Sequence, residues 1–362
     1  MDLRTFTLEE LEQYLNPLFA SQGSTLPLSP LRLKSYLANP RADKGDTVLF
    51  EMHHENQLVG YRTLLPDKFY DQEGFSRGFA WLSGNWVHPR MRRQGISTLL
   101  LNEAEEKWHG RLMYTNYAPD SKALYDNTDR FQLIARREGK RYYLRSNAEE
   151  LLANRIKAGA LLKMGDRLIN QLREKQLNSF RFQEPGSISL ERMKEPAPDM
   201  EAIISLIQQD SLFRRDTNIF SWALGNPWVT GQDIPHINYH FSYRSDKFEN
   251  ILYKFQDEEN GAMGMLWLIH HNRAISVPYL FAEDDQLLTA MASTLTRTMI
   301  ELGCTHTTIR HPGLIARLEA FSKLFLSSKQ MPQLVFAHKN LSDSIPSGAF
   351  IHDGDGDVMF TG

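Results

Sequence analysis

The 362-residue sequence contains a single cysteine, Cys304, and therefore cannot form an intramolecular disulfide. Cys304 lies in ELGCTHTTI, where a small side chain packed in the interior is favoured over a nucleophile. No apolar run approaches the ~20 residues that a helix needs to cross a bilayer. The sequence therefore argues against a disulfide scaffold and against a membrane-spanning protein.

The sequence also lacks an excess of either charge, with a formal net charge of −3. A balance so near zero provides no general attraction to nucleic acid or to an anionic membrane. The first residues, MDLRTFTLEELEQYL, are acidic and amphipathic, without the apolar stretch and cleavage site of a secretory signal. We therefore expect a soluble, cytoplasmic protein with no nucleic-acid or membrane partner.

The first part of the chain has the pattern of a mixed α/β sheet. A helix is expected to start at Thr7, because Thr7 and Glu10 have capping-box spacing, and to end before Pro17. A short helix over 121–127 is expected to have Asp120 or Ser121 as its N-cap. The other expected elements are strands over 47–53, 57–65, 78–87 and 111–117, a helix over 96–108, and a hairpin that turns near residues 138–140.

The remainder is expected to contain a long helix from Ala148 to about Gln176 and then a second copy of the same plan. The basic flank of this helix is typical of a membrane-surface helix, but Asp166 and Glu174 interrupt it and favour a connector. Strands are expected over 249–255, 262–269, 274–281, 305–310 and 333–339, with helices over 286–302 and 313–321. These patterns predict two α/β domains, 1–146 and 177–362, joined by the helix 147–176.

The most distinctive stretch is VHPRMRRQGIS, Val87 to Ser97, between a strand and an amphipathic helix. Unpaired N–H groups and a partial positive charge are expected at the start of that helix. Gly95 lets a ligand approach the backbone, and three arginines add full charges, so the stretch can hold a pyrophosphate. A solvated basic turn is the simpler alternative. The corresponding stretch of the second half, AEDDQ, is acidic and lacks glycine, which predicts no anion site there.

This stretch closely resembles the acyl-CoA-binding signature of the GNAT acetyltransferases, Arg/Gln-x-x-Gly-x-Gly/Ala after a strand that often ends Val-x-Pro. The final small residue is replaced by Ser97. The resemblance covers about residues 1–145 and implies two GNAT-like acyl-CoA N-acyltransferase domains, the second degenerate. It also implies that a strand end binds the pantetheine arm of acetyl-CoA and that a loop binds its pyrophosphate. The residues concerned are Trp86, Val87 and His88 at the strand end, and Arg92, Arg93, Gln94, Gly95, Ile96 and Ser97 in the loop.

The same resemblance implies direct attack of a primary amine on the thioester of acetyl-CoA. The N–H of Val87 or its neighbour would stabilise the oxyanion. Tyr125 matches the position at which family members carry a tyrosine that protonates the departing thiolate, although packing against the sheet is its alternative role. Glu51, His53, His54 and His88 are candidates for the general base, but each is more simply a surface or turn residue, and none is assigned.

We therefore expect an acetyl-CoA-dependent N-acetyltransferase that acts on a small-molecule amine. The alternative is a module that binds or senses acyl-CoA without turnover. No metal cofactor is expected: His270, His271 and His306 lack zinc-site spacing, and the alternating Asp353, Asp355 and Asp357 favour a C-terminal turn over a calcium loop. The amine and the oligomeric state are left open by the sequence.

Overall fold

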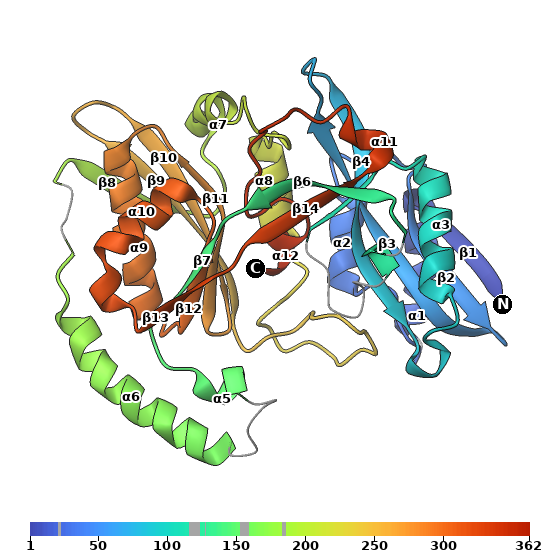
Figure 1. The fold of residues 1–362 in the computed structure, drawn as a ribbon, viewed down its shortest axis with the longest axis horizontal. Coiled ribbons are helices and arrows are strands. Elements are labelled where there is room, and N and C mark those ends of the chain that lie inside the picture. Colours follow the sequence, from blue (N-terminus) through green and yellow to red (C-terminus); the bar gives the residue numbers. More distant parts are fainter. Residues whose placement is uncertain (21–22, 116–123, 127, 153–158, 183–185) are drawn as a thin grey trace. The chain divides into compact units, whose positions relative to one another are not determined.

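The computed structural model describes residues 1–20, 23–115, 124–126, 128–152, 159–182 and 186–362 (Figure 1). It is an α/β protein with two compact units, each built on a seven-stranded mixed sheet. The first unit comprises residues 1–137, 204–245 and 333–361, and the second comprises 138–203, 246–332 and 362. The expected fold class is confirmed. The expected domains 1–146 and 177–362 and the linker 147–176 stay a prediction. The compact units of the structure follow other bounds, since each combines separate stretches of the chain.

The sheet of the first unit has the strand order β1-β2-β3-β4-β5-β14-β6. All neighbouring pairs are antiparallel except β4 and β5, which are parallel. The strands are β1 (Asp2–Thr7), β2 (Thr47–His54), β3 (Gln57–Tyr70), β4 (Ser76–Val87), β5 (Leu112–Thr115), β6 (Phe131–Arg137) and β14 (Gln333–His338). The expected hairpin of β2 and β3 is confirmed, and Glu55 and Asn56 in its turn have positive φ, as a tight two-residue turn requires.

Helix α3 (Ile96–Trp108) covers one face of this sheet and coincides with the expected helix. Its buried Leu100 and Ala104 pack with Phe50 and Leu64 of the strands. The helix lies so close to β3 that a Cβ on Gly60 would be 2.7 Å from Cγ2 of Ile96. Glycine at position 60 therefore fixes how closely the start of α3 approaches the sheet.

Helix α1 (Leu8–Ala20) begins where the sequence predicts. The backbone N–H and the hydroxyl of Thr7 both donate to Oε2 of Glu10, each at 2.8 Å, which confirms the capping box. The predicted end at Pro17 is wrong, since the helix continues to Ala20. A proline costs a helix one hydrogen bond, and one lost bond so near the end does not stop the final turn.

The sheet of the second unit has the order β13-β7-β12-β11-β10-β9-β8. Its pairs are antiparallel except for the parallel pair β11 and β12. Read from β8, the second sheet has three antiparallel pairs, one parallel pair and two antiparallel pairs, which is the sequence of pair orientations that the first sheet has when read from β1. The strands are β7 (Lys140–Tyr143), β8 (Ile188–Met193), β9 (Phe248–Asp257), β10 (Met263–His271), β11 (Ala274–Ala282), β12 (His306–Ile309) and β13 (Ser327–Gln330).

The expected hairpin over residues 131–145 is wrong. β6 pairs with β14 in the first sheet, whereas β7 pairs with β12 and β13 in the second. The glycine that suggested a turn, Gly139, has another role. A Cβ there would lie 2.6 Å from the backbone oxygen of Met331, so the residue permits a close approach of two backbones.

The long helix is present in part. α5 (Ala148–Leu152) and α6 (Gly159–Ser179) lie within the expected region, while residues 153–158 lie outside the described residues. The other helices are α2 (Pro30–Leu37), η1 (Pro89–Met91), η2 (Pro198–Met200), α7 (Glu201–Ile207), α8 (Thr217–Gly225), α9 (Asp285–Glu301), α10 (Pro312–Ala320), η3 (Ser322–Leu324), α11 (Lys339–Ser342) and α12 (Val358–Thr361). Among the described residues, no helix combines the length and the apolar composition that spanning a membrane requires.

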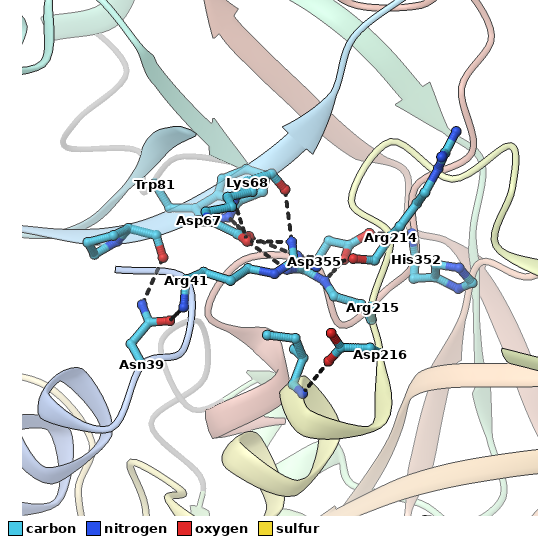
Figure 2. Close-up of polar contacts among 12 residues, drawn as sticks. Asn39, Arg41, Asp67, Lys68, Trp81, Arg214, Arg215, Asp216, His352 and Asp355 are labelled. Carbon is cyan, nitrogen blue, oxygen red and sulfur yellow. Dashed lines mark hydrogen bonds and ion pairs between the residues drawn. The ribbon is translucent and has the colours of Figure 1, made fainter. Parts of the chain in front are cut away.

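A buried ion network ties the C-terminal segment of the first unit to β3 (Figure 2). Arg215 donates to both carboxylate oxygens of Asp67, at 2.7 and 2.8 Å, and to Asp355 at 3.0 and 3.1 Å. Arg41 adds a second guanidinium at 3.0 Å from Asp67, and the indole of Trp81 donates to the same carboxylate at 2.8 Å. Two arginines and two aspartates therefore neutralise each other in the interior.

The two carboxylates of this network respond differently to their surroundings. Burial raises the pKa of Asp67, but Arg215 and Arg41 more than reverse this effect, so its pKa lies well below the usual range. Burial also raises the pKa of Asp355, and there Arg215 offsets only part of the rise. Asp355, one of the three alternating acidic residues near the C-terminus, thus serves as an ion-pair partner inside the fold.

Candidate functional site

Strand β4 (Ser76–Val87) is longer than its parallel neighbour β5 (Leu112–Thr115). Among the described residues, the two strands are paired at Ala80–Leu112 and Trp81–Met113 and at no later position. Directly after this pairing the register between β3 and β4 shifts at Ser83, whereas β4 remains paired with β3 as far as Val87. The end of β4, with Trp86 and Val87, therefore lies beyond the last pair that the described residues of β4 and β5 form.

The loop after β4 is held in a defined conformation. Nδ1 of His88 accepts from the N–H of Arg90 at 3.3 Å and caps η1. Arg93 has a φ of 63°, and Gly95, the N-cap of α3, has a φ of 80° in the left-handed region. The side chains from Arg92 to Gln94 are exposed around this turn, while Ile96 is buried beneath it.

The first turn of α3 has no side-chain cap, since Gly95 has no side chain to supply one. A helix start whose N–H groups lack side-chain acceptors, beside exposed arginines, is a suitable site for an anion. Helix α9 occupies the same position in the second unit but begins differently. The carboxylate of its N-cap, Asp284, accepts from the N–H of Leu287 at 2.8 Å and adds a negative charge. Only the first of these two helix starts has the chemistry of a phosphate site.

The loop residues singled out from the sequence thus lie together at one strand-to-helix junction. Ser97 is half-buried, and its hydroxyl accepts from the side-chain amide of Asn85 at 3.4 Å. The side chain of Arg92 donates to the carbonyl of Val87 at 3.4 Å, and that of Gln94 to the carbonyl of Arg90 at 3.4 Å. These contacts help to fix the course of the loop around Gly95.

Tyr125 lies in a helical turn over 124–126, while the rest of its expected helix and both expected N-caps lie outside the described residues. Its ring stacks on that of Tyr114 of β5, with centroids 4.2 Å apart, and meets the ring of Phe131 edge-on. The hydroxyl accepts from Nη1 of Arg62 at 3.2 Å. The packing role and a polar contact are thus combined in one side chain.

Arg62 is the residue of this site that the sequence analysis missed. It lies in the middle of β3, in QLVGYRTLL, and is fully buried. A charged residue within an apolar strand is itself a signal, because burying a charge is costly unless the charge is used. Arg62 is in register with Asn85 of β4, so both lie on the sheet face that α3 covers.

Two of the four candidates for the general base are buried, which makes the expectation of a surface or turn position wrong for them. Glu51 of β2 is fully buried and accepts from the hydroxyl of Tyr14 at 2.6 Å. Its other contact is to Nε2 of His53, also buried, at 2.8 Å. Burial, with the Glu51 charge second, raises the pKa of Tyr14 far above its usual value. His54 is exposed, as expected, and His88 caps η1.

Glu51 lies on the sheet face opposite α3, in register with Tyr61, which in turn pairs with Trp86. The ring of His240 stacks on Trp86 with centroids 4.1 Å apart, and burial lowers the pKa of His240, with the neighbouring His88 adding to the effect. The aromatic and acidic groups of this face come from distant parts of the chain, so no local sequence pattern brings them together.

Arg32 of α2 lies on this same face. Its Nη2 donates to the hydroxyls of Tyr36, Thr63 and Ser83, at 3.0, 2.9 and 2.8 Å, and its guanidinium lies 4.1 Å from the ring of Trp228. A buried arginine therefore lies against each face of the central strands, Arg62 of β3 on one and Arg32 of α2 on the other.

Residues set aside as structural in the sequence analysis remain outside the site. Cys304 is buried, and burial raises its pKa to about 11, which disfavours the reactive thiolate. Within the described part of the chain, no group of three or more His, Cys, Asp and Glu could hold a metal ion.

The fold and the junction define an α/β protein with a candidate anion site at a helix start. Residues 8–127 match the model of the acetyltransferase (GNAT) family. The family uses acetyl-CoA as its co-substrate, so an N-acetyltransferase of general kind is supported. A second, degenerate copy of the family domain stays a prediction.

No curated protein matches the sequence. Similar solved structures include a GCN5-related N-acetyltransferase from Kribbella flavida, 14% identical, with a TM-score of 0.46, covering 92% of this chain and 70% of that one. One from Anabaena variabilis is 11% identical, with a TM-score of 0.47 and coverage of 92% and 72%. Eis1 from Mycobacterium abscessus is 12% identical, with a TM-score of 0.46 and coverage of 92% and 73%.

Proposed function

We propose that the protein is a cytoplasmic acetyl-CoA-dependent N-acetyltransferase whose acceptor is a small-molecule amine. The observation that carries the proposal is the uncapped start of α3, with Gly95 in the left-handed region and exposed arginines around it. In the proposal, the N–H groups from Arg93 to Ser97 and the arginine side chains hold the pyrophosphate. Nucleic acid, membrane and metal have no part in it.

In the proposed reaction the neutral amine attacks the thioester carbonyl carbon, and the carbonyl electrons move to oxygen. The N–H of Val87 or its neighbour stabilises that oxyanion at the end of β4. When the intermediate collapses, the C–S bond breaks and sulfur takes the electron pair. Tyr125 protonates the sulfur, and the nitrogen releases a proton to solvent. The products are the N-acetylated amine and CoA.

The acceptor is proposed to approach from the sheet face opposite α3. This face carries Glu51, Tyr61 and Trp86 on adjacent strands, and Glu51 is buried with Oε1 lacking a hydrogen-bond partner. The second unit is proposed to lack a donor site, because Asp284 caps the start of α9 with a negative charge.

The first experiment measures acetyl-CoA binding by calorimetry in Gly95→Asp and Gly95→Asn. The two side chains have the same shape and both tolerate a left-handed backbone, so only the charge differs. We expect at least about tenfold weaker binding for aspartate than for asparagine, since each tenfold corresponds to about 1.4 kcal/mol of repulsion at the diphosphate. Equal binding by the two variants, or no binding by the wild type, would refute the donor site.

The second experiment measures thiol release from acetyl-CoA across a panel of small amines. Release above the amine-free rate supports transfer. Tight acetyl-CoA binding without release for any amine would favour the alternative, a module that binds or senses acyl-CoA without turnover.

A further inference from the structure

The guanidinium of Arg62 is buried on β3 with very few partners. The side chain is fully buried, and its Nη1 donates to the hydroxyl of Tyr125 at 3.2 Å. Nε and Nη2 are buried and have no hydrogen-bond partner. No carboxylate of the described residues forms an ion pair with Arg62. Among the described residues, nothing neutralises the cation at this position.

Such a position is costly for stability. A buried charge without an opposite charge is destabilising, and apolar replacements of buried ionic groups are often neutral or stabilising. The neighbouring Asn85 is in register with Arg62, and its Oδ1 is also buried without a partner. The stability of the sheet therefore gives no reason for an arginine here, and its one observed contact is with Tyr125.

The hydrogen bond from Arg62 determines in which direction the O–H of Tyr125 points. A guanidinium has five N–H donors and no acceptor, so it can only donate to the phenol oxygen. The hydroxyl of Tyr125 must accept from Arg62, and its own hydrogen must then point away from Arg62. A lysine could act in the same way, whereas an apolar side chain would remove this constraint on the direction of the hydroxyl.

We propose that Arg62 is a positioning residue that aims the proton of Tyr125 at the sulfur of CoA. This inference rests on the proposed function. When the C–S bond breaks and sulfur takes the electron pair, the Tyr125 proton moves to sulfur along the direction that Arg62 sets. The phenolate left behind faces the guanidinium until solvent returns a proton to it. Arg62 itself touches neither the donor nor the amine.

The test titrates the thiol of bound CoA, followed by the ultraviolet absorbance of the thiolate, and requires no knowledge of the amine. A hydrogen bond from Tyr125 stabilises the thiolate and lowers the thiol pKa in the wild type relative to free CoA. In Tyr125→Phe this pKa should rise by on the order of 1. Arg62→Met should produce the same rise, and Arg62→Lys, which still donates, should remain close to the wild type.

The double variant, Arg62→Met with Tyr125→Phe, separates positioning from direct charge. If Arg62 acts through Tyr125, the double variant titrates like Tyr125→Phe alone. A further rise in the double variant, or an unchanged titration in Arg62→Met, would overturn the proposal. Calorimetry with CoA and thermal unfolding accompany each variant, and the dissociation constant of CoA should change less than about threefold, because Arg62 is not part of the proposed pyrophosphate loop.

The outcomes distinguish this inference from the proposed function. If wild-type protein does not bind CoA, the proposed function is wrong, and the role of Arg62 is rejected with it. If CoA binds, and the pKa of its thiol changes in Tyr125→Phe but not in Arg62→Met, only the positioning role of Arg62 is wrong.

Discussion

Single residues of this chain carry charge at points where the surrounding pattern is apolar. Glu51, Arg62 and Asp67 all lie within strands of the first sheet, and each is buried. Tyr14, Tyr125 and Arg215, which contact them, come from distant segments, whereas His53 lies two residues from Glu51. A local pattern therefore reveals that such a residue is unusual, but its contact is visible only in the fold.

Buried histidines make the stability of the protein depend on pH. His270 of β10 is buried, and its Nε2 donates to the carbonyl of Asn272 at 2.8 Å. Burial lowers its pKa, and the hydrogen bond and the charges of Lys247, Glu249 and His271 modify that effect. In the unfolded chain the imidazole has a pKa of about 6.5 and binds a proton more readily. Stability should therefore decrease as the pH falls through about 6.5.

His270→Gln tests this dependence, because the glutamine amide can still donate to Asn272 but does not titrate. The variant should lose less unfolding free energy than the wild type between about pH 7.5 and 5.5, as measured by urea unfolding at each pH. The matched control is His54→Gln at an exposed position, which should follow the wild-type profile. Equal slopes for all three proteins would contradict the role of His270.

At the scale of elements, two helices in equivalent positions begin with different chemistry. α3 starts at a glycine without a side-chain cap, and α9 starts at the carboxylate of Asp284. The first start is open to an anion at the expense of a stabilising cap. The second is stabilised and carries the wrong charge for a phosphate.

Asp284→Ala should therefore affect stability and leave donor binding unchanged. Losing an N-cap costs about 1 kcal/mol, within a range of roughly 0.5–2. Asp284→Asn keeps an oxygen that can accept from Leu287 and should retain most of the stability. Urea unfolding measures the loss, and calorimetry should give the wild-type affinity for acetyl-CoA in both variants. Weaker acetyl-CoA binding in either one would place a donor site in the second unit.

The ion network also acts at the scale of elements, since it attaches the segment around Asp355 to β3. Asp67→Asn leaves two buried guanidinium groups, Arg215 and Arg41, facing a neutral amide. The loss of one partner of a buried ion pair costs about 3–5 kcal/mol. The exposed pair Asp233–Arg244 provides the control, since Asp233→Asn should cost less than about 1 kcal/mol. Similar losses of unfolding free energy in Asp67→Asn and Asp233→Asn, measured by urea unfolding, would show that the ion network contributes little to stability.

The pH dependence of that difference follows from the Asp67 pKa. Its folded pKa is lowered, so its stabilisation is present above the unfolded value of about 3.9 and declines as the pH falls below it. The difference in unfolding free energy between wild type and Asp67→Asn should therefore become smaller below about pH 4. A gap that widens there would contradict the assigned ion pairs.

Elements with strong local signals could be predicted from the sequence, whereas their partners could not. The bounds of α3 and the cap of α1 follow from helical spacing and from a capping pair, both of which are local. β6 and β7 were also found as strands, but their pairing as a hairpin was wrong. Which strand lies next to which depends on segments hundreds of residues away, such as β14. The loop around Gly95 could be predicted because its residues are consecutive in the sequence. The contact of Tyr125 with Arg62 could not, because it joins residues that are far apart in the chain.

At the scale of the whole molecule, each of the two sheets contains a strand that is distant in sequence from its other strands. β14 lies between β5 and β6 in the first sheet, and β7 lies between β12 and β13 in the second. Each unit therefore needs segments from both halves of the sequence. This arrangement explains why a sequence that resembles two successive domains yields interleaved units.

A fragment of residues 1–146, the first domain predicted from the sequence, should accordingly fail to fold alone. It lacks β14, the strand with which β6 pairs, and it lacks Arg215 and Asp355, which accompany Asp67 in the interior. Exposed strand edges and the loss of one of the two guanidinium groups that pair with Asp67 both disfavour a soluble monomer. We expect the fragment to be insoluble or oligomeric by size-exclusion chromatography, and co-expression with residues 147–362 to restore a soluble complex. A monomeric fragment with cooperative thermal unfolding would instead establish 1–146 as an independent domain and make the exchanged strands dispensable.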